Sequence, residues 1–361
     1  MIVGAVGHAF PSHYYDQAQL IEAFKTLWLS RHYNAERLER LHQNVRVGGR
    51  HLALPLEEYQ RLENWGQAND AWIRVAQEVG AAALDAALAK LGLDYSEIDA
   101  LFTVTVTGVA TPSLDARLMN RRPFRPDTKR IPIFGLGCVA GAAGIARAAD
   151  YVRAFPDQIA VLLSVELCSL TVQRGDLSIP NLIATGLFGD GAAAAILLGE
   201  EAAARRGLGG RGGGYKVSGT RSVFYPDTEG VMGWDISGHG FQIVLSAEVP
   251  QMVEKHLRGD VDAFLADHGT SRAEIARFVC HPGGPKVLTT MEEQLETPPG
   301  ALDATWRSLE EVGNLSSTSV LLVLEENLDE LKREPPPPGE KALLLAMGPG
   351  FCSELVLLEA R

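Results

Sequence analysis

Residues 135–144 read GLGCVAGAAG, a glycine turn followed by the small side chains that a closely packed helix start requires. The stretch predicts a helix over Cys138–Phe155, with the thiol of Cys138 in its first turn. Residues 311–317 read EVGNLSS and form a second helix-start signal, which predicts a helix over Asn314–Leu331. The two helix starts therefore decide where the chemistry-bearing residues of this chain lie.

Apolar runs alternate with helical patterns along the chain, which is typical of an α/β fold. Beyond the two helices above, we predict helices over Asp70–Leu91, Val244–Leu257 and Arg272–Ile275, and strands over Ala100–Val106, Ile131–Phe134, Ala160–Val165, Ala192–Leu198, Ala342–Ala346 and Glu354–Leu358.

The two halves of the chain resemble each other as a diverged duplication would. EIDALF at residues 97–102 is similar to EIARF at residues 274–278. Cys138 follows the first stretch at nearly the same spacing as Asn314 follows the second. We therefore expect Cys138 and Asn314 at equivalent helix N-termini, and His281 at the loop end of a strand in the second half.

The duplication also predicts the division of the chain. We expect one half over residues 1–205, carrying the thiol, and a second half over residues 215–361, carrying the imidazole and the amide. Residues 202–214 between them are rich in Ala, Arg and Gly but lack a phosphate-loop pattern, so they are predicted to be a linker.

Composition excludes several functional classes. The chain has 361 residues, 46% of them hydrophobic and 22% charged, as in soluble globular proteins. A net charge of −12 argues against nucleic-acid binding. The sequence has no apolar run long enough for a membrane span and no signal-peptide pattern. Four cysteines without a CxxC pair predict neither a disulfide framework nor a metal site, and free thiols fit a reducing cytoplasm.

Cys138 is the candidate nucleophile. A cysteine is most often a small buried hydrophobic residue, but this one follows a Gly-x-Gly turn at a predicted helix start. Helix N-terminal amides stabilise a thiolate, so we expect the pKa of Cys138 to be lowered towards neutrality. Small neighbouring side chains would let a substrate carbonyl approach the sulfur closely.

His281 and Asn314 are the candidate partners of Cys138. Adjacent residues of a strand point to opposite faces, so either Cys280 or His281 reaches the site. His281 could be an ordinary loop histidine, or it could pair with the thiolate and donate to a thioester oxygen. Asn314 could be a helix N-cap, or its amide could lie beside His281. Two neutral donors directed at one oxyanion suit a decarboxylation that leaves an enolate.

Four motifs carry a family resemblance: GCVAG at 137–141, LFGDGAAA at 187–194, HPGGP at 281–285 and GNLSS at 313–317. With these motifs in this order, the sequence resembles the type III polyketide synthases of the chalcone synthase family, in the thiolase-like superfamily. The resemblance implies an αβαβα thiolase-like fold with two pseudo-symmetric halves, a cytoplasmic homodimer, and acyl-CoA and malonyl-CoA as substrates without a bound cofactor or metal.

The resemblance also implies roles. Cys138 would accept the acyl starter, and His281 and Asn314 would bind malonyl-CoA and stabilise the enolate after decarboxylation. Phe188 and Phe241 match two phenylalanines beside the thiol, although Phe241 could equally belong to the core. Further positions match cavity-shaping residues: Thr111, which would reach the cavity of the partner subunit, and Cys168, Thr171, Met232 and Ser316.

Two arginines match basic residues that meet the phosphates of CoA. Arg37 and Arg40 lie on a polar segment, so a solvated helix face is the alternative. CSLT at 168–171 and WDIS at 234–237 resemble bacterial members that take fatty acyl starters and make alkylpyrones or alkylresorcinols. Small residues at Thr111 and Cys168 would open an apolar tunnel for an alkyl chain.

Three other interpretations stay open. A type III synthase with a short or aromatic starter would share every motif above. A ketosynthase III-like enzyme would carry out one condensation with an acyl-carrier-protein substrate, and a non-catalytic thiolase-fold subunit would only bind. The sequence leaves open the starter, the number of extensions, and whether the ring closes as a lactone or by aldol chemistry.

Overall fold

The computed structural model describes residues 1–28, 34–208 and 213–361, which form an α/β protein. Its main sheet has nine strands in the order β11-β12-β13-β8-β1-β7-β6-β4-β5. The strands are β1 (Ile2–Ala9), β4 (Ala100–Thr105), β5 (Lys129–Phe134), β6 (Ile159–Leu167), β7 (Asp190–Leu198), β8 (Tyr215–Phe224), β11 (Ile275–Cys280), β12 (Lys341–Gly348) and β13 (Cys352–Ala360).

Two halves of this sheet repeat one topology. In the first half, β4 is parallel to β6, β6 is antiparallel to β7, and β7 is antiparallel to β1. The second half repeats this pattern: β11 is parallel to β12, β12 is antiparallel to β13, and β13 is antiparallel to β8. The half-sheets join where Ile2 and Val3 of β1 pair with β8. The predicted duplication is therefore confirmed in the strand order.

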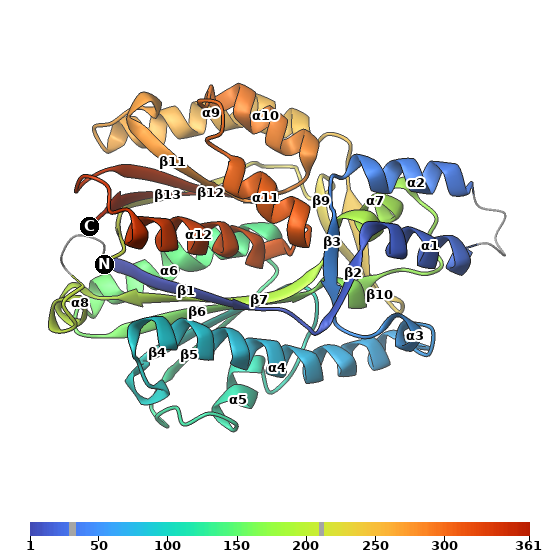
Figure 1. Ribbon diagram of the computed structural model, residues 1–361, viewed down its shortest axis with the longest axis horizontal. Coiled ribbons are helices and arrows are strands. Elements are labelled where there is room, and N and C mark those ends of the chain that lie inside the picture. Colours follow the sequence, from blue (N-terminus) through green and yellow to red (C-terminus); the bar gives the residue numbers. More distant parts are fainter. Residues whose placement is uncertain (29–33, 209–212) are drawn as a thin grey trace.

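Helices form three layers around the half-sheets (Figure 1). Between the half-sheets lie α6 (Ala140–Ala154) and α12 (Ser319–Arg333). The outer face of the first half-sheet is covered by α4 (Trp65–Leu91) and α5 (Leu114–Met119), and that of the second by α9 (Val249–Asp267), α10 (Pro285–Leu295) and α11 (Asp303–Val312). The layers follow the αβαβα order that the family resemblance implies.

A cap of smaller elements covers one end of these layers. It contains the hairpin of β2 (His13–Asp16) and β3 (Gly49–Leu52), the hairpin of β9 (Met232–Ser237) and β10 (Gly240–Leu245), and the helices α1 (Gln17–Trp28), α2 (Ala35–Asn44), α3 (Leu56–Tyr59) and α7 (Ile179–Leu187). The short helix α8 (Glu200–Arg205) lies at the opposite end (Figure 1).

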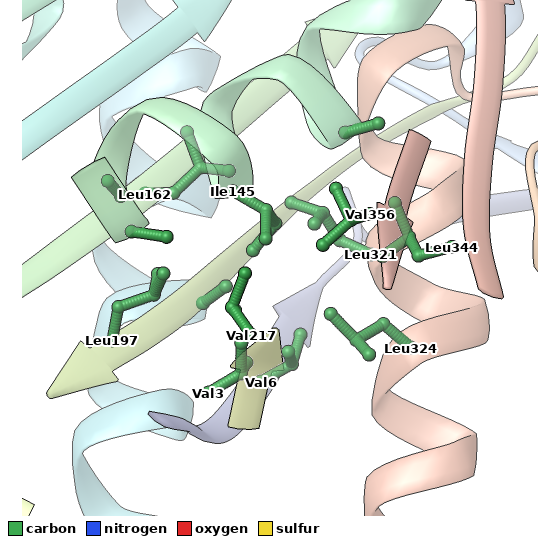
Figure 2. Packing of buried hydrophobic residues seen from close by; sticks show 14 of the residues in the cluster. Val3, Val6, Ile145, Leu162, Leu197, Val217, Leu321, Leu324, Leu344 and Val356 are labelled. Carbon is green, nitrogen blue, oxygen red and sulfur yellow. The ribbon is translucent and has the colours of Figure 1, made fainter. Parts of the chain in front are cut away.

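The core explains why strands such as β6 are apolar at nearly every position. Leu162 of β6 faces the middle layer, where it belongs to one cluster with Ile145 of α6 and Leu321 of α12 (Figure 2). Its neighbour Leu163 faces α4 in a second cluster. Because successive side chains of a strand point to opposite faces, a strand buried on both sides has no polar face.

All five predicted helices differ from the structure in at least one bound: the helix predicted from Asp70 begins at Trp65, and the helix predicted from Cys138 begins at Ala140. The other three differ as follows. The stretch Val244–Leu257 divides, because Val244 and Leu245 end a hairpin strand and the helix begins only at Val249. Residues 272–274 form one 3-10 turn, after which Ile275 begins β11. The helix expected from Asn314 begins at Ser319. In the predicted linker, α8 takes up residues up to Arg205, and residues 209–212 lie outside the described residues.

Candidate active site

Cys138 lies in a 3-10 turn, Gly137–Val139, directly before α6. Gly137 has a positive φ of 59°, and a Cβ at this position would lie 2.5 Å from Cγ of Pro349, so the turn requires glycine. The thiol is buried, and its Sγ lies 3.6 Å from Oγ of Ser316 in the turn before α12. The two helix starts therefore meet at this thiol, as the duplication predicts.

Asn314 lies upstream of its helix, in an extended segment paired with the residues around Phe188. Its backbone N–H donates to Leu187 O at 2.9 Å, and its carbonyl accepts from Gly189 N at 3.0 Å. Its side-chain Oδ1 accepts from Ser316 N at 2.8 Å, and Nδ2 donates to Gly283 O at 3.4 Å. Asn314 therefore fixes the turn that holds Ser316 and also contacts the loop after His281.

His281 follows β11 directly, as predicted. Its backbone N–H donates to Leu345 O of β12, and its carbonyl accepts from Gly283 N. The side chain is 3% exposed, and within the described residues neither ring nitrogen has a hydrogen-bond partner. Burial lowers the pKa of His281 to about 4, so the imidazole is neutral at pH 7, with one N–H donor and one acceptor nitrogen.

The thiol of Cys138 departs from the expected acidity. Burial raises the pKa of Cys138 to about 11, and the hydrogen bond with Ser316 opposes this only in part. The lowered pKa that the helix start suggested is therefore not found. A buried thiol beside a buried carboxyl group, Glu166, stays protonated unless a base takes up its proton.

A cavity of about 990 Å³ lies in the cap and is lined by Phe188, the residue that pairs with Asn314, whereas Cys138, His281 and Asn314 themselves do not line it. Among the predicted residues, Cys168, Thr171 and Phe188 line it, and Trp234 and Ile243 of the β9–β10 hairpin close another side. Apolar side chains supply much of the remaining wall: Leu20, Phe24, Leu27, Leu56, Leu62 and Leu170. Charged and amide side chains, among them Glu63, Arg174 and Asn181, also line the cavity, so its wall offers both apolar and polar contacts to a ligand.

Comparison with known proteins identifies the family. Residues 1–201 match the family "Chalcone and stilbene synthases, N-terminal domain", and residues 217–360 match its C-terminal domain. The chain belongs to the chalcone and stilbene synthase family. It is a type III polyketide synthase with a thiolase-like fold, and hence a decarboxylating acyltransferase.

Relatives of this synthase cover the whole chain. The 1,3,6,8-tetrahydroxynaphthalene synthase of Streptomyces peucetius subsp. caesius is 52% identical over 99% of this chain and 92% of its own. A putative chalcone synthase of Bacillus subtilis is 36% identical over 98% and 97% of the two chains. The crystal structure of the 1,3,6,8-tetrahydroxynaphthalene synthase of Streptomyces coelicolor A3(2), a bacterial type III polyketide synthase, matches with a TM-score of 0.90 at 30% identity, covering 100% and 99%.

Several predicted residues of the synthase lie away from the Cys138 junction. Phe241 is buried against Trp65 and Trp234 and does not line the cavity, which agrees with the core alternative. Met232 packs at the edge of the second-half core. Thr111 is exposed in the loop before α5. Arg37 and Arg40 are exposed on α2, and among the described residues neither forms an ion pair.

Glu166 is a site residue that the sequence analysis missed. It lies on β6, completely buried, and accepts hydrogen bonds from Ser317 Oγ at 2.5 Å, Thr107 Oγ1 at 2.8 Å and Val106 N at 3.1 Å. Burial raises its pKa to about 7. A single glutamate within the apolar run IAVLLSVEL was the available signal, because a carboxyl group is seldom placed in a core strand without a specific need.

Proposed function

We propose that this synthase carries its growing chain on Cys138 and lengthens it with malonyl-CoA held by His281 and Asn314. The supporting observation is the chain of contacts described above: Cys138 to Ser316, Ser316 to Asn314, and Asn314 to Gly283 in the loop of His281. Cys138, Asn314 and His281 come from three different segments of the chain, and these segments meet only in the folded protein.

Acylation of the thiol is the first step. The neutral His281 takes the proton of Cys138, and the thiolate attacks the thioester carbonyl of the incoming acyl-CoA. The sulfur–carbonyl bond to Cys138 forms, the bond to CoA breaks, and CoA leaves as a thiol with the proton from His281. The raised pKa of Cys138 makes this proton acceptor necessary at pH 7.

Decarboxylation and condensation follow. The N–H groups of His281 and Asn314 donate to the thioester oxygen of malonyl-CoA, carbon dioxide leaves, and the resulting enolate is stabilised by both donors. Its carbon attacks the Cys138 thioester, and Cys138 departs as thiolate. The chain, now two carbons longer and bound to CoA, returns to Cys138 for the next cycle.

For the product we favour a compact aromatic polyketide made from malonyl-CoA alone. The relative that is 52% identical is named for 1,3,6,8-tetrahydroxynaphthalene. All carbon atoms of that compound lie in its two fused rings, so two-carbon units derived from malonyl-CoA account for the whole skeleton. The high identity over nearly the full chain supports the same product class here.

A fatty acyl starter leading to an alkylpyrone or alkylresorcinol is the second candidate. The leucine and phenylalanine wall of the cavity next to Cys168 favours it, because each buried methylene contributes about 0.8 kcal/mol. A short or aromatic starter, and delivery by an acyl-carrier protein, are the remaining alternatives. The candidates differ in which starter raises product formation.

The test is mass spectrometry of products from the purified protein. Malonyl-CoA is supplied alone, with acyl-CoA starters from acetyl to stearoyl, and with acyl-carrier protein as the acyl donor. The proposal predicts an aromatic product from malonyl-CoA alone that is absent with Cys138→Ala. Pyrones or resorcinols that form only from long acyl-CoAs would establish the second candidate, and product with carrier protein alone would contradict CoA dependence.

We also propose a cytoplasmic homodimer that binds the phosphates of CoA at Arg37 and Arg40. Exposed guanidinium groups on α2 suit phosphate oxygens. The substitutions Arg37→Ala and Arg40→Ala should then raise KM for malonyl-CoA several-fold but leave KM for the malonyl thioester of N-acetylcysteamine, which has no phosphate, unchanged. Equal effects on both substrates would contradict this assignment.

Every helix in the described residues is too short or too polar to span a bilayer.

A further inference from the structure

Arg50 of β3 is a fully buried cation, 1% exposed, for which the condensation chemistry gives no role. Its Nη1 donates to Gln17 Oε1 at 2.9 Å and to the carbonyl of Gly186, and its Nη2 donates to the carbonyl of Thr185. The two carbonyls belong to the last turn of α7. Carbonyls at a helix C-terminus lack intrahelical partners and carry the negative end of the helix dipole, so they bind a cation well.

The stem of Arg50 passes between the two chain segments that meet at the active site. A Cβ on Gly189 would lie 3.1 Å from Cβ of Arg50, and a Cβ on Gly313 would lie 3.7 Å from its Cδ. Gly189 follows Phe188, and Gly313 precedes Asn314. The side chain therefore packs against both strands of the short backbone bridge that joins Phe188 to Asn314.

The surroundings of Arg50 hold its charge at this place. The buried carboxylate of Asp190, next after Gly189, attracts the guanidinium and partly offsets the burial that lowers the pKa of Arg50 to about 10. Asp190 itself accepts hydrogen bonds from Ala53 N and Ser169 N. A guanidinium buried in this way, at the wall of the cavity, stays charged at neutral pH.

We infer that Arg50 is a positioning residue for condensation: by binding the end of α7 and packing on Gly189 and Gly313, it fixes the backbone from which the amide of Asn314 is presented. The inference rests on the role given to Asn314 in the proposed function. Acylation of Cys138 uses His281 and not Asn314, so Arg50 should matter for decarboxylation and much less for acylation.

The experiment compares the two half-reactions in the full-length protein with Arg50→Lys. Lysine keeps the charge but cannot reach two carbonyls and Gln17 with one ammonium group. Carbon dioxide release from malonyl-CoA should fall about 10- to 100-fold, as a small misplacement of a binding group does. Acylation of Cys138 by acetyl-CoA, followed by intact-protein mass spectrometry in a single turnover, should change less than about threefold.

Arg277→Lys is the control, because the partly exposed Arg277 near the start of β11 also joins two acceptors, Glu330 and Glu340, but contacts neither α7 nor the Phe188–Asn314 bridge in the described hydrogen bonds. It should leave both half-reactions unchanged. If Arg50→Lys does not fold, Gln17→Leu can replace it, because it removes one acceptor of the guanidinium. Gln17→Leu should also slow decarboxylation more than acylation, but by a smaller factor. Recovery of decarboxylation when guanidinium ion is added to Arg50→Ala would support the inference further.

The variant Asn314→Ala distinguishes failure of the proposed function from failure of the role given to Arg50. If it releases carbon dioxide as fast as the parent protein, the proposed function fails, and the inference fails with it. If Asn314→Ala is slow but Arg50→Lys is not, only the role of Arg50 is overturned. Equal losses of acylation and decarboxylation in Arg50→Lys would show a general structural role and would also overturn it.

Discussion

Cys138 and His281 are both buried, and burial favours the uncharged form of each. A thiol and a neutral imidazole can exchange one proton, whereas a preformed ion pair in this core would need further hydrogen bonds. Within the part of the chain that the structure describes, the hydroxyl of Ser316 is the side-chain group that hydrogen-bonds to Sγ of Cys138.

Ser316→Ala should slow alkylation of Cys138. The hydroxyl of Ser316 stabilises the thiolate, so its loss raises the pKa of Cys138 further and lowers the thiolate fraction at a given pH. We expect the iodoacetamide rate at pH 8 to fall about three- to tenfold, the effect of one hydrogen bond to a charged group. Ser308→Ala, at a buried serine without a partner in the described residues, is the control. An unchanged rate in Ser316→Ala would contradict the contact.

Glu166→Gln should change how stability depends on pH. The pKa of Glu166 is about 7 in the folded protein and near 4.5 when unfolded, so the folded state binds the proton more tightly. Its contribution to stability is full below about pH 4.5 and is lost as pH rises through 7. The difference in unfolding free energy between the parent protein and Glu166→Gln, parent minus variant, should fall by about 3 kcal/mol between pH 4.5 and 8.

Urea denaturation at several pH values measures this difference, with the exposed Glu57→Gln as a control that should show no such slope. A parent–variant difference that is flat across this pH window would contradict the burial of an ionisable group at Glu166.

The residues of the site were unequally visible in the sequence. Cys138, His281 and Asn314 stand out because glycine turns precede or follow each of them, and the structure places them in three connected turns. Arg50 and Glu166 were not found, because the hydrogen-bond partners that give each residue its place come from distant segments of the chain. The roles of Phe241, Met232 and Thr111 depended on resemblance alone and stay predictions; Phe241 is buried against Trp65 and Trp234, two residues that line the cavity.

At the level of elements, the approach of α6 to the turn before α12 positions the site. A Cβ on Gly141 in the first turn of α6 would lie 2.2 Å from the carbonyl oxygen of Ser317 and 2.6 Å from Cγ1 of Val320. The absence of a side chain at this position lets Ser316 reach Cys138. Small residues after Cys138 therefore serve packing between the two halves, beyond the access for substrate that the sequence suggested.

Gly141→Ala should separate the two turns. Relieving a contact with backbone requires one helix to move, which costs about 1–3 kcal/mol of unfolding free energy, and kcat should fall with it. Gly259→Ala is the matched control: this glycine lies inside α9 with open space around it, and the substitution should stabilise by up to about 1 kcal/mol. Thermal denaturation and product formation test both, and a fully active Gly141→Ala would contradict the close approach.

Element boundaries show the limit of local patterns. Both helices that the glycine turns predict begin later than expected, after a 3-10 turn: α6 at Ala140 and α12 at Ser319. Asn314 instead adopts an extended conformation because it pairs with Phe188, a residue more than a hundred positions away. A pairing of this kind leaves no signal in the local sequence.

For the whole molecule, β5 at one edge of the sheet is the surface to test for dimerisation. It is largely exposed, and Phe134 at its end is 48% exposed. An exposed strand edge with apolar side chains favours association. We predict a dimer in analytical ultracentrifugation at micromolar concentration, weakened by Phe134→Glu, and a parent protein that sediments as a monomer would contradict the homodimer.

The α/β class and the duplication were predictable from alternating apolar and helical patterns and from the matched spacing of Cys138 and Asn314, whereas the layer order followed from the family resemblance. The cap that carries α1, α2, α7 and both hairpins was not predicted. Its helices and strands are short and show only weak alternation of apolar and polar residues. They are ordered by packing against the layers. The cavity and Arg50 both belong to this cap, so local sequence patterns could not reveal either of them.

The most direct test of the central claim is to trap the chain on its nucleophile. The synthase is incubated with malonyl-CoA, quenched in acid, digested and analysed by peptide mass spectrometry. We expect the peptide containing Cys138 to carry acetyl and longer adducts that differ by one C2H2O unit. Asn314→Ala should accept an acetyl group from acetyl-CoA but fail to lengthen it, and His281→Ala should fail already at acylation. Adducts on another cysteine, or lengthening in the absence of Asn314, would contradict this claim.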